Sequence, residues 1–147
     1  MKSRKLLAEM LGTSLLVFFG VGVATLSFGF KLTGMSASAG VVATALAFGL
    51  VMVIMAYAIG PISGAHINPA VTMGFLVSRR MSAVDAISYW VAQIIGAIVG
   101  AWLLYLIFSS IAGYSTATVG LGTDGYGAQS MISLGAGGAF LAETILT

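Results

Sequence analysis

The sequence predicts an all-α membrane protein, and three observations carry this prediction. Of the 147 residues, 59% are hydrophobic and only 7% are charged, whereas a soluble domain has about 25% charged residues. Three apolar runs are each long enough to cross a hydrocarbon core of about 30 Å as a helix. Between the second and third runs, residues 60–78 contain a possible helix of only half that length. We therefore expect a helical bundle with a short helix that enters the membrane without crossing it.

Composition also excludes several functions. The chain has no cysteine, one histidine and four acidic residues, so we expect no disulfide, no metal site and no cofactor. These few polar residues offer no nucleophile–base pair, and we do not expect an enzyme. The net charge of +2 does not come from basic runs interleaved with aromatic residues, so nucleic acid is not an expected partner.

The apolar runs define the expected transmembrane spans. The first covers about residues 6–30 and is too long for the apolar region of a signal peptide. The second covers about 39–59. The third covers about 86–109 and contains Gly96 and Gly100 in the GxxxG spacing that favours close helix packing. The aromatic residues of the third span are expected toward the membrane surfaces: Tyr89, Trp90, Trp102 and Tyr105.

The remaining part of the chain is more polar or shorter. Residues 110–133 are rich in Gly, Ser, Thr and Tyr, and we expect them to form a long external loop. A fourth apolar segment begins at residue 134, but it has fewer than the roughly 20 residues needed to cross a bilayer. We interpret residues 134–147 as the start of a fourth transmembrane helix.

Basic residues predict the orientation of the chain. Lys2, Arg4 and Lys5 precede the first span, and an arginine pair, residues 79–80, ends the short helix, whereas Lys31 stands alone on the other side. Cytoplasmic segments of membrane proteins carry an excess of Lys and Arg. We therefore expect a multi-pass protein of the cell (plasma) membrane with a cytoplasmic N-terminus.

The short helix is predicted from Asn68 and Pro69. Asn is a favoured N-cap residue, and Pro is favoured at the first helical position. From Asn68 to Arg79 the helix would be about 15 Å long, so Asn68 would lie near the membrane midplane. Residues 62–67 would then be non-helical backbone at membrane depth, which is tolerated where protein buries it or a wet cavity adjoins it. The alternative is an ordinary helix start, which Asn-Pro often marks in soluble proteins.

A loose repeat relates the two ends of the chain. Leu7-Ala8-Glu9 in the first span recurs as Leu141-Ala142-Glu143 in the fourth apolar segment. The first copy begins a span that leaves the cytoplasm, and the second belongs to a span that enters from outside. Repeats of opposite topology build many transport folds around a midplane site. The alternative is a chance match.

The segment from His66 to Gly74, HINPAVTMG, resembles the signature of the aquaporin and glycerol-facilitator family, the major intrinsic proteins. Further matches lie in each span: Ala8-Glu9 with Gly12-Thr13, Ala45-Leu46-Ala47-Phe48-Gly49, and Gln93 with Gly96. The resemblance covers essentially the whole chain and is greatest to prokaryotic water channels of the aquaporin Z type. It implies an aquaporin-like right-handed helical bundle. Residues 1–133 would form its first inverted repeat, with three transmembrane helices and one re-entrant half-helix.

The family pattern has six spans, two half-helices and a tetramer with one pore per subunit. This sequence has one Asn-Pro-Ala box, and it lacks the second box, the arginine beside it and the fifth-span filter residue. It is therefore similar to the N-terminal half of an aquaporin. A fragment, a split gene product and a natural half-length protein all fit this pattern.

The resemblance also implies roles for individual residues. Asn68, Pro69 and Ala70 would form the pore motif, with the Asn68 amide orienting a passing water molecule. Phe48 is similar to the filter aromatic of water-selective members. Glu9 would support the re-entrant loop by accepting hydrogen bonds from its backbone N–H groups, and Glu143 would support a second loop. Further pore-lining residues would be Met52, Gly64, Ala65, His66 and Ile67.

Without the resemblance, these residues can also be explained by purely structural roles. Asn68 is also explained as a helix cap, and Phe48 as an ordinary core or lipid-facing aromatic. A lone histidine such as His66 is more often a structural hydrogen-bonding group than a ligand.

The sequence thus predicts a passive channel for water and other small neutral solutes that excludes ions and protons. Its expected setting is the lipid bilayer, as a homotetramer or with a partner chain that supplies the second half. One alternative is a half-length subunit that conducts only in such a pair, and another is a non-conducting interaction subunit. Glycerol transport is less favoured, because glycerol-conducting members commonly have Trp where Phe48 stands.

Overall fold

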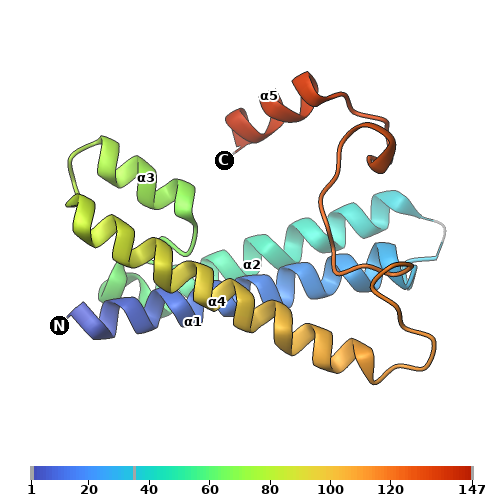
Figure 1. The fold of residues 1–147 in the computed structure, drawn as a ribbon, viewed down its shortest axis with the longest axis horizontal. Helices are drawn as coiled ribbons and strands as arrows, with labels where there is room; N and C mark the ends of the chain where they lie inside the picture. The colour runs from blue at the N-terminus through green and yellow to red at the C-terminus, as the bar shows by residue number, and fades with distance from the viewer. Residues whose placement is uncertain (1, 35, 147) are drawn as a thin grey trace.

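A computed structural model describes residues 2–34 and 36–146, and the regular elements in these ranges are all helical (Figure 1). Three helices are long and apolar enough to cross a membrane. They are α1 (Lys2–Ala24), which continues as the π-helical turn η1 (Thr25–Gly29), α2 (Ala37–Ser63) and α4 (Ala83–Ser109). The predicted all-α membrane fold, with three long helices and shorter ones, is confirmed.

Helix α1 lies between α2 and α4 and packs against both. Two glycines of α4 allow its close approach to α1. A Cβ atom at Gly96 would overlap the carbonyl oxygen of Met10, and one at Gly100 would overlap that of Ser14. A backbone carbonyl cannot rotate away as a side chain can, so any larger residue would push the helices apart. The close packing predicted from the GxxxG spacing is confirmed.

Helix α2 extends further than we predicted. We expected the second span to end near residue 59 and residues 62–67 to be non-helical, but the helix continues through Pro61 to Ser63. Proline is tolerated there because its fixed φ is helical and only one hydrogen bond near the helix end is lost. The helix ends at Gly64, whose φ of 94° is left-handed and favours glycine. Only residues 64–68 are therefore non-helical, and we call them the crossing segment.

Helix α3 (Pro69–Val77) is the predicted short helix. The Asn68 side-chain oxygen accepts a hydrogen bond from the Ala70 N–H at 2.8 Å, and Pro69 occupies the first helical position. The predicted N-cap is therefore confirmed. Helix α3 packs against α4, and a turn at residues 78–82 joins the two helices at the end of the molecule that holds the N-terminus (Figure 1).

The C-terminal part of the chain is less tightly associated with the bundle. Residues 110–135 form a long connection with one short 3₁₀ turn, η2 (Gly127–Gln129). Helix α5 (Ala136–Leu146) has no buried residue and lies apart from the three long helices (Figure 1). It begins at Ala136, two residues after the start of the segment 134–147 that we expected to form the beginning of a fourth transmembrane helix.

Candidate functional site

A buried polar cluster holds the crossing segment against α1 and α4. Its centre is Glu9 of α1, which is fully buried. Glu9 Oε1 accepts hydrogen bonds from Ser63 Oγ at 2.7 Å and from the His66 N–H at 2.9 Å. Glu9 Oε2 accepts from the Ile67 N–H at 2.7 Å and from Gln93 Nε2 at 2.9 Å. A buried carboxylate is costly unless it is well hydrogen-bonded, and here four neutral donors compensate it.

The backbone of the crossing segment is strained, and Glu9 offsets that strain. Gly64, Ala65 and Ile67 have φ values of 94°, 49° and 39°. The left-handed region costs about 1–2 kcal/mol for an ordinary L-residue, and it is least suited to a β-branched residue such as Ile. In this conformation the N–H groups of His66 and Ile67 both reach the same carboxylate. The strained segment and the buried carboxylate therefore depend on each other.

Thr72 of α3 connects the crossing segment with α4. Its buried hydroxyl oxygen lies 3.0 Å from His66 Nδ1 and accepts a hydrogen bond from Gln93 Nε2 at 3.0 Å. The Gln93 amide nitrogen thus bridges Glu9 and Thr72. Because this nitrogen must face the carboxylate, the other amide atom, Gln93 Oε1, is buried without a partner in the described part of the chain.

His66 is held by packing as well as by hydrogen bonds. Its side chain is buried, and its ring stacks on Phe75 with 4.3 Å between ring centroids. The ring of Tyr89 lies on another side, at 5.1 Å. This environment fixes the direction of the backbone on both sides of His66. Among the residues described, the His66 ring has no acidic or metal-binding group as a hydrogen-bond partner.

Tyr89, which we expected toward a membrane surface, is buried within the helical bundle. It is only 4% exposed, and its hydroxyl donates to the carbonyl oxygen of Ser63, at the end of α2, at 2.8 Å. Trp90 is half-buried and donates from Nε1 to the Pro69 carbonyl at 3.0 Å. Both aromatics therefore anchor the residues that flank the crossing segment. The other two aromatics of this helix, Trp102 and Tyr105, are exposed.

The remaining motif residues lie at the start of α3. Asn68 is half-buried, and Pro69 and Ala70 are exposed. Asn68 Oδ1 is occupied by the cap, whereas Asn68 Nδ2 has no hydrogen-bond partner among the described residues. The N-terminus of a helix carries a partial positive charge of about half a unit. This end of α3 therefore presents a free amide donor and positive potential.

Phe48 and Met52 lie one turn apart on α2, away from this cluster. Phe48 is separated from Ser63 by about 22 Å of helix. Its ring packs over Gly20 of α1, where a Cβ atom would collide with it. Phe48 also lines a cavity of about 820 Å³ together with Thr44 and parts of the loop at residues 116–131. Met52 is exposed.

Three residues of the cluster were not predicted as functional: Gln93 was noted only as a match to the family pattern, and Ser63 and Thr72 were given no role. A single amide in an apolar span was a signal that could have identified Gln93, because an unpaired amide is costly in a membrane. Thr72 follows Asn68 by one helical turn, which places both on the same face of α3. Ser63 carried no comparable signal, since its role depends on where α2 ends.

Comparison with known proteins agrees with this architecture. The family model described as "Major intrinsic protein" matches residues 1–147. The chain belongs to the major intrinsic protein family, a family of membrane channels. The match also confirms the prediction that the chain is not an enzyme.

The relatives include several bacterial proteins named aquaporin Z. The protein from Rhodopseudomonas palustris is 45% identical over 100% of this chain and 59% of its own length. The protein from Brucella melitensis biotype 1 is 47% identical over 97% of this chain and 60% of its own length. The protein from Photorhabdus laumondii is 42% identical over 98% and 61%. The chain thus spans about three-fifths of the length of these relatives.

Proposed function

We propose that the protein contributes to a passive channel for water and other small neutral solutes that excludes ions and protons. The observation that carries this proposal is Asn68, whose Oδ1 caps α3 while its Nδ2 stays available to a water oxygen. A donor at this position orients each passing water and interrupts a proton-conducting chain. The positive end of α3, directly beside it, disfavours cations.

The crossing segment also supports the proposal, because most of its backbone carbonyl oxygens are free to accept hydrogen bonds from water. The N–H groups of His66 and Ile67 are bound by Glu9. The carbonyl oxygens of residues 64–67 accept no hydrogen bond from the described residues. Unpaired carbonyls at membrane depth are tolerated where water satisfies them. Gly64, Ala65, His66 and Ile67 would therefore line the passage with successive acceptors.

Phe48 and Met52 would form an apolar part of the same passage. An aromatic ring at Phe48 narrows the passage, and an apolar wall offers few hydrogen bonds that would delay water. The aquaporin Z relatives support water rather than glycerol as the main solute. A filter role for Phe48 rests on its resemblance to the family and on its place at the cavity near the long loop.

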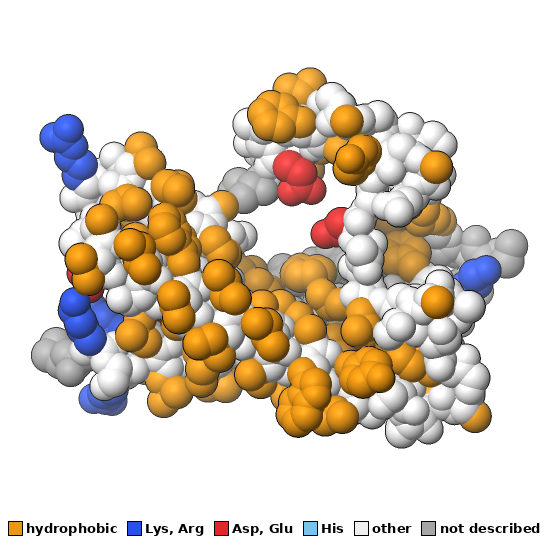
Figure 2. Space-filling model, viewed as in Figure 1, with side chains coloured by type: hydrophobic (Ala, Val, Ile, Leu, Met, Phe, Trp, Pro, Cys, Tyr) orange, Lys and Arg blue, Asp and Glu red, His pale blue; other side chains and the backbone are white. Residues whose placement is uncertain are grey.

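The distribution of charge supports a cytoplasmic N-terminus in the plasma membrane. Basic side chains gather at the end of the molecule that holds the N-terminus (Figure 2). The N-terminal basic residues and the pair Arg79-Arg80 belong to this end, and Lys31 follows η1 at the opposite end of α1. An excess of basic residues marks the cytoplasmic side.

A homotetramer is our proposal for the assembled state.

A second candidate is a subunit that conducts only after pairing with a second half. The observation that favours it is the large uncovered apolar surface of α2. Only five of its residues are buried: Gly40, Val51, Met55, Ile59 and Ser63. Lipid can cover the part of this surface that faces the bilayer, whereas in a closed pore another polypeptide segment must cover the part that faces the passage. The same requirement applies to the exposed N-terminus of α3.

The test is osmotic shrinkage of proteoliposomes, measured by stopped-flow light scattering. Asn68→Asp places a negative charge at the proposed narrowest region and should lower water permeability about tenfold, a loss of about 1.4 kcal/mol in transition-state terms. Ser78→Asp is the matched control, because it adds the same charge at the other, exposed end of α3. The comparison is made under conditions in which the unchanged protein conducts water, and equal permeability of the two variants there would contradict the proposal.

A second reconstitution into proteoliposomes distinguishes an independent channel from a subunit that conducts only after pairing. The chain is assayed alone and with the part of the Rhodopseudomonas palustris relative that it does not cover. Permeability from the chain alone supports an independent channel. Permeability that requires the added part supports the pairing alternative.

A further inference from the structure

A separate cavity of about 310 Å³ opens at the end of the molecule that holds the N-terminus. It lies between the first turns of α1, the turn before α4 and the first turns of α4. Its lining includes three basic side chains, Lys2, Lys5 and Arg80, and one acidic side chain, Asp85. Neither the crossing segment nor Phe48 lines this cavity, so the proposed channel function does not account for its charge.

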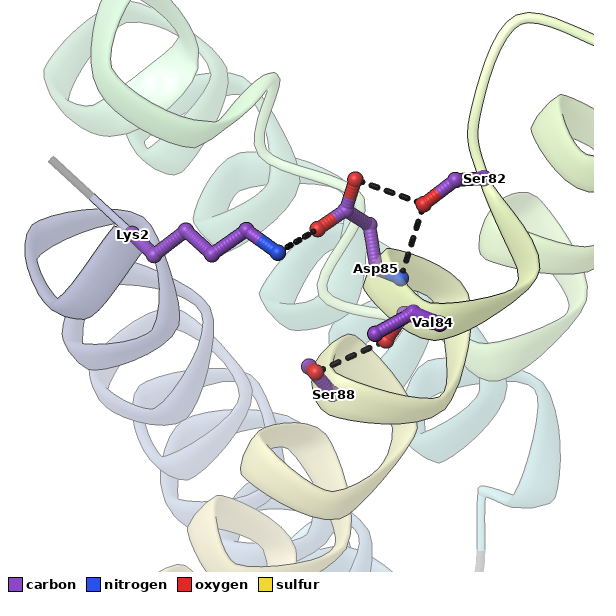
Figure 3. Close-up of polar contacts among 5 residues, drawn as sticks. All are labelled: Lys2, Ser82, Val84, Asp85 and Ser88. Carbon is purple, nitrogen blue, oxygen red and sulfur yellow. Dashed lines mark hydrogen bonds and ion pairs between the residues drawn. The ribbon is translucent and has the colours of Figure 1, made fainter.

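Asp85 is already paired within the protein (Figure 3). Its Oδ1 lies 2.8 Å from Lys2 Nζ, and its Oδ2 accepts a hydrogen bond from Ser82 Oγ at 2.7 Å. Its backbone N–H donates to the same Ser82 oxygen at 3.1 Å, so the Ser82 side chain caps the N-terminus of α4. The nearby Ser88 hydroxyl donates to the Val84 carbonyl at 2.8 Å. The acid thus offsets the charge of Lys2, with which it forms a close ion pair.

The three basic side chains of the lining outnumber its one acid, so the cavity keeps a net positive charge even though Asp85 attracts Lys5 as well as Lys2. Neither Lys5 nor Arg80 forms an ion pair with an acid among residues 2–34 and 36–146. Two like charges around one concave surface repel each other, and the repulsion is reduced when an anion binds between them. The cavity lining is therefore electrostatically complementary to an anion.

The position of the cavity suggests which anion. It lies at the ends of two helices long enough to cross a membrane, α1 and α4. The lining also contains apolar side chains, Leu6 and Met81. Basic pockets between transmembrane helices at a membrane surface suit phosphate-bearing lipid head groups. Arginine adds the fork of N–H donors that matches a phosphate.

We propose that this cavity binds a phosphate group, carried by an anionic phospholipid or by free phosphate. Lys5 and Arg80 are its cationic ligands, and the Lys2–Asp85 pair forms a fixed wall beside them. This site is independent of the proposed water passage.

The test compares two double variants that remove the same charge. Lys5→Gln with Arg80→Gln removes both proposed ligands. Arg4→Gln with Arg79→Gln removes two neighbouring basic groups that do not line the cavity. All four side chains are exposed, so neither pair of changes disturbs the buried core. Binding of phosphatidylglycerol to the detergent-solubilised chain is titrated by native mass spectrometry, with phosphatidylcholine as the neutral lipid.

We expect Lys5→Gln with Arg80→Gln to weaken phosphatidylglycerol binding at least fivefold, and Arg4→Gln with Arg79→Gln to weaken it less than twofold. Phosphatidylcholine binding should change less than twofold in either variant, because its choline group neutralises the charge of its phosphate. Equal weakening by both variants, or none by the first, would overturn the proposal. Competition with inorganic phosphate then identifies the source: displacement of the lipid indicates that free phosphate also binds, and no displacement assigns the site to lipid.

Discussion

Glu9 and Glu143 stand in the same tripeptide, Leu-Ala-Glu, and have opposite environments. Glu9 is fully buried and accepts four hydrogen bonds. Glu143 lies on α5 and is exposed. Both tripeptides are helical, so local sequence accounts for the helix in each case. The burial of Glu9 depends instead on a distant segment that supplies donors.

This comparison shows how an acid becomes tolerable inside a membrane protein. No basic side chain hydrogen-bonds to Glu9 within the described residues. Its charge is compensated by N–H groups that a strained backbone turns toward it. Loss of the Glu9 carboxylate would leave the N–H groups of His66 and Ile67 unpaired, and loss of these N–H groups would leave the buried carboxylate uncompensated. A supporting role of Glu143 for a second loop remains a prediction.

The largest expected effect comes from Glu9→Ala. It leaves Ser63 Oγ, two backbone N–H groups and Gln93 Nε2 without their acceptor. Each buried donor left unpaired costs about 1–3 kcal/mol, and water entry relieves part of this cost. We expect a loss of about 4 kcal/mol in the free energy of unfolding, measured by SDS titration of the detergent-solubilised protein. Glu143→Ala should change it by less than about 0.5 kcal/mol, and similar losses in both variants would remove the distinction.

A smaller effect is expected from Gly96→Ala, which tests whether the helices that carry Glu9 and Gln93 must touch. The added Cβ overlaps the Met10 carbonyl, so α1 and α4 must separate. Overpacking of this kind costs about 1–3 kcal/mol, read in the same unfolding titration. Gly49→Ala is the control, because a Cβ there has open space around it. Unchanged stability of Gly96→Ala would show that the interface is looser than the structure indicates.

The smallest effect is expected from Tyr89→Phe, which removes one hydrogen bond at the edge of the cluster. The Ser63 carbonyl loses its donor, at a cost of about 1 kcal/mol in the free energy of unfolding. Tyr105→Phe on the same helix serves as the control, since Tyr105 is 44% exposed. An equal loss in the control would mean that the hydroxyl of Tyr89 contributes nothing specific.

The elements that follow from local chemistry were predictable. The three long helices correspond to apolar runs, and the start of α3 follows from the side chain of Asn68 and the ring of Pro69. The close approach at Gly96 follows from the absence of a side chain. Each of these predictions depends on neighbouring residues alone.

The features that depend on distant contacts were harder to predict. We expected α2 to end near residue 59, but it continues through Pro61, because a proline near a helix end removes only one hydrogen bond. Tyr89 was expected toward a membrane surface because aromatic residues are enriched there. Its hydrogen bond to the Ser63 carbonyl, 26 positions away in the chain, could not be predicted from the local sequence. The bridge from Gln93 to Thr72 likewise joins two helices. Sequence patterns report periodicity, and they do not report which donor meets which acceptor.

The most direct test of the account is amide hydrogen exchange at His66 and Ile67. If Glu9 holds the crossing segment, these two amides should exchange slowly in the unchanged protein. In Glu9→Gln they should exchange at least about tenfold faster, while the central amides of α1 and α4 remain protected. Glu143→Gln should leave both rates unchanged. Unaltered protection of His66 and Ile67 in Glu9→Gln would contradict the claim that the buried carboxylate holds this backbone in place.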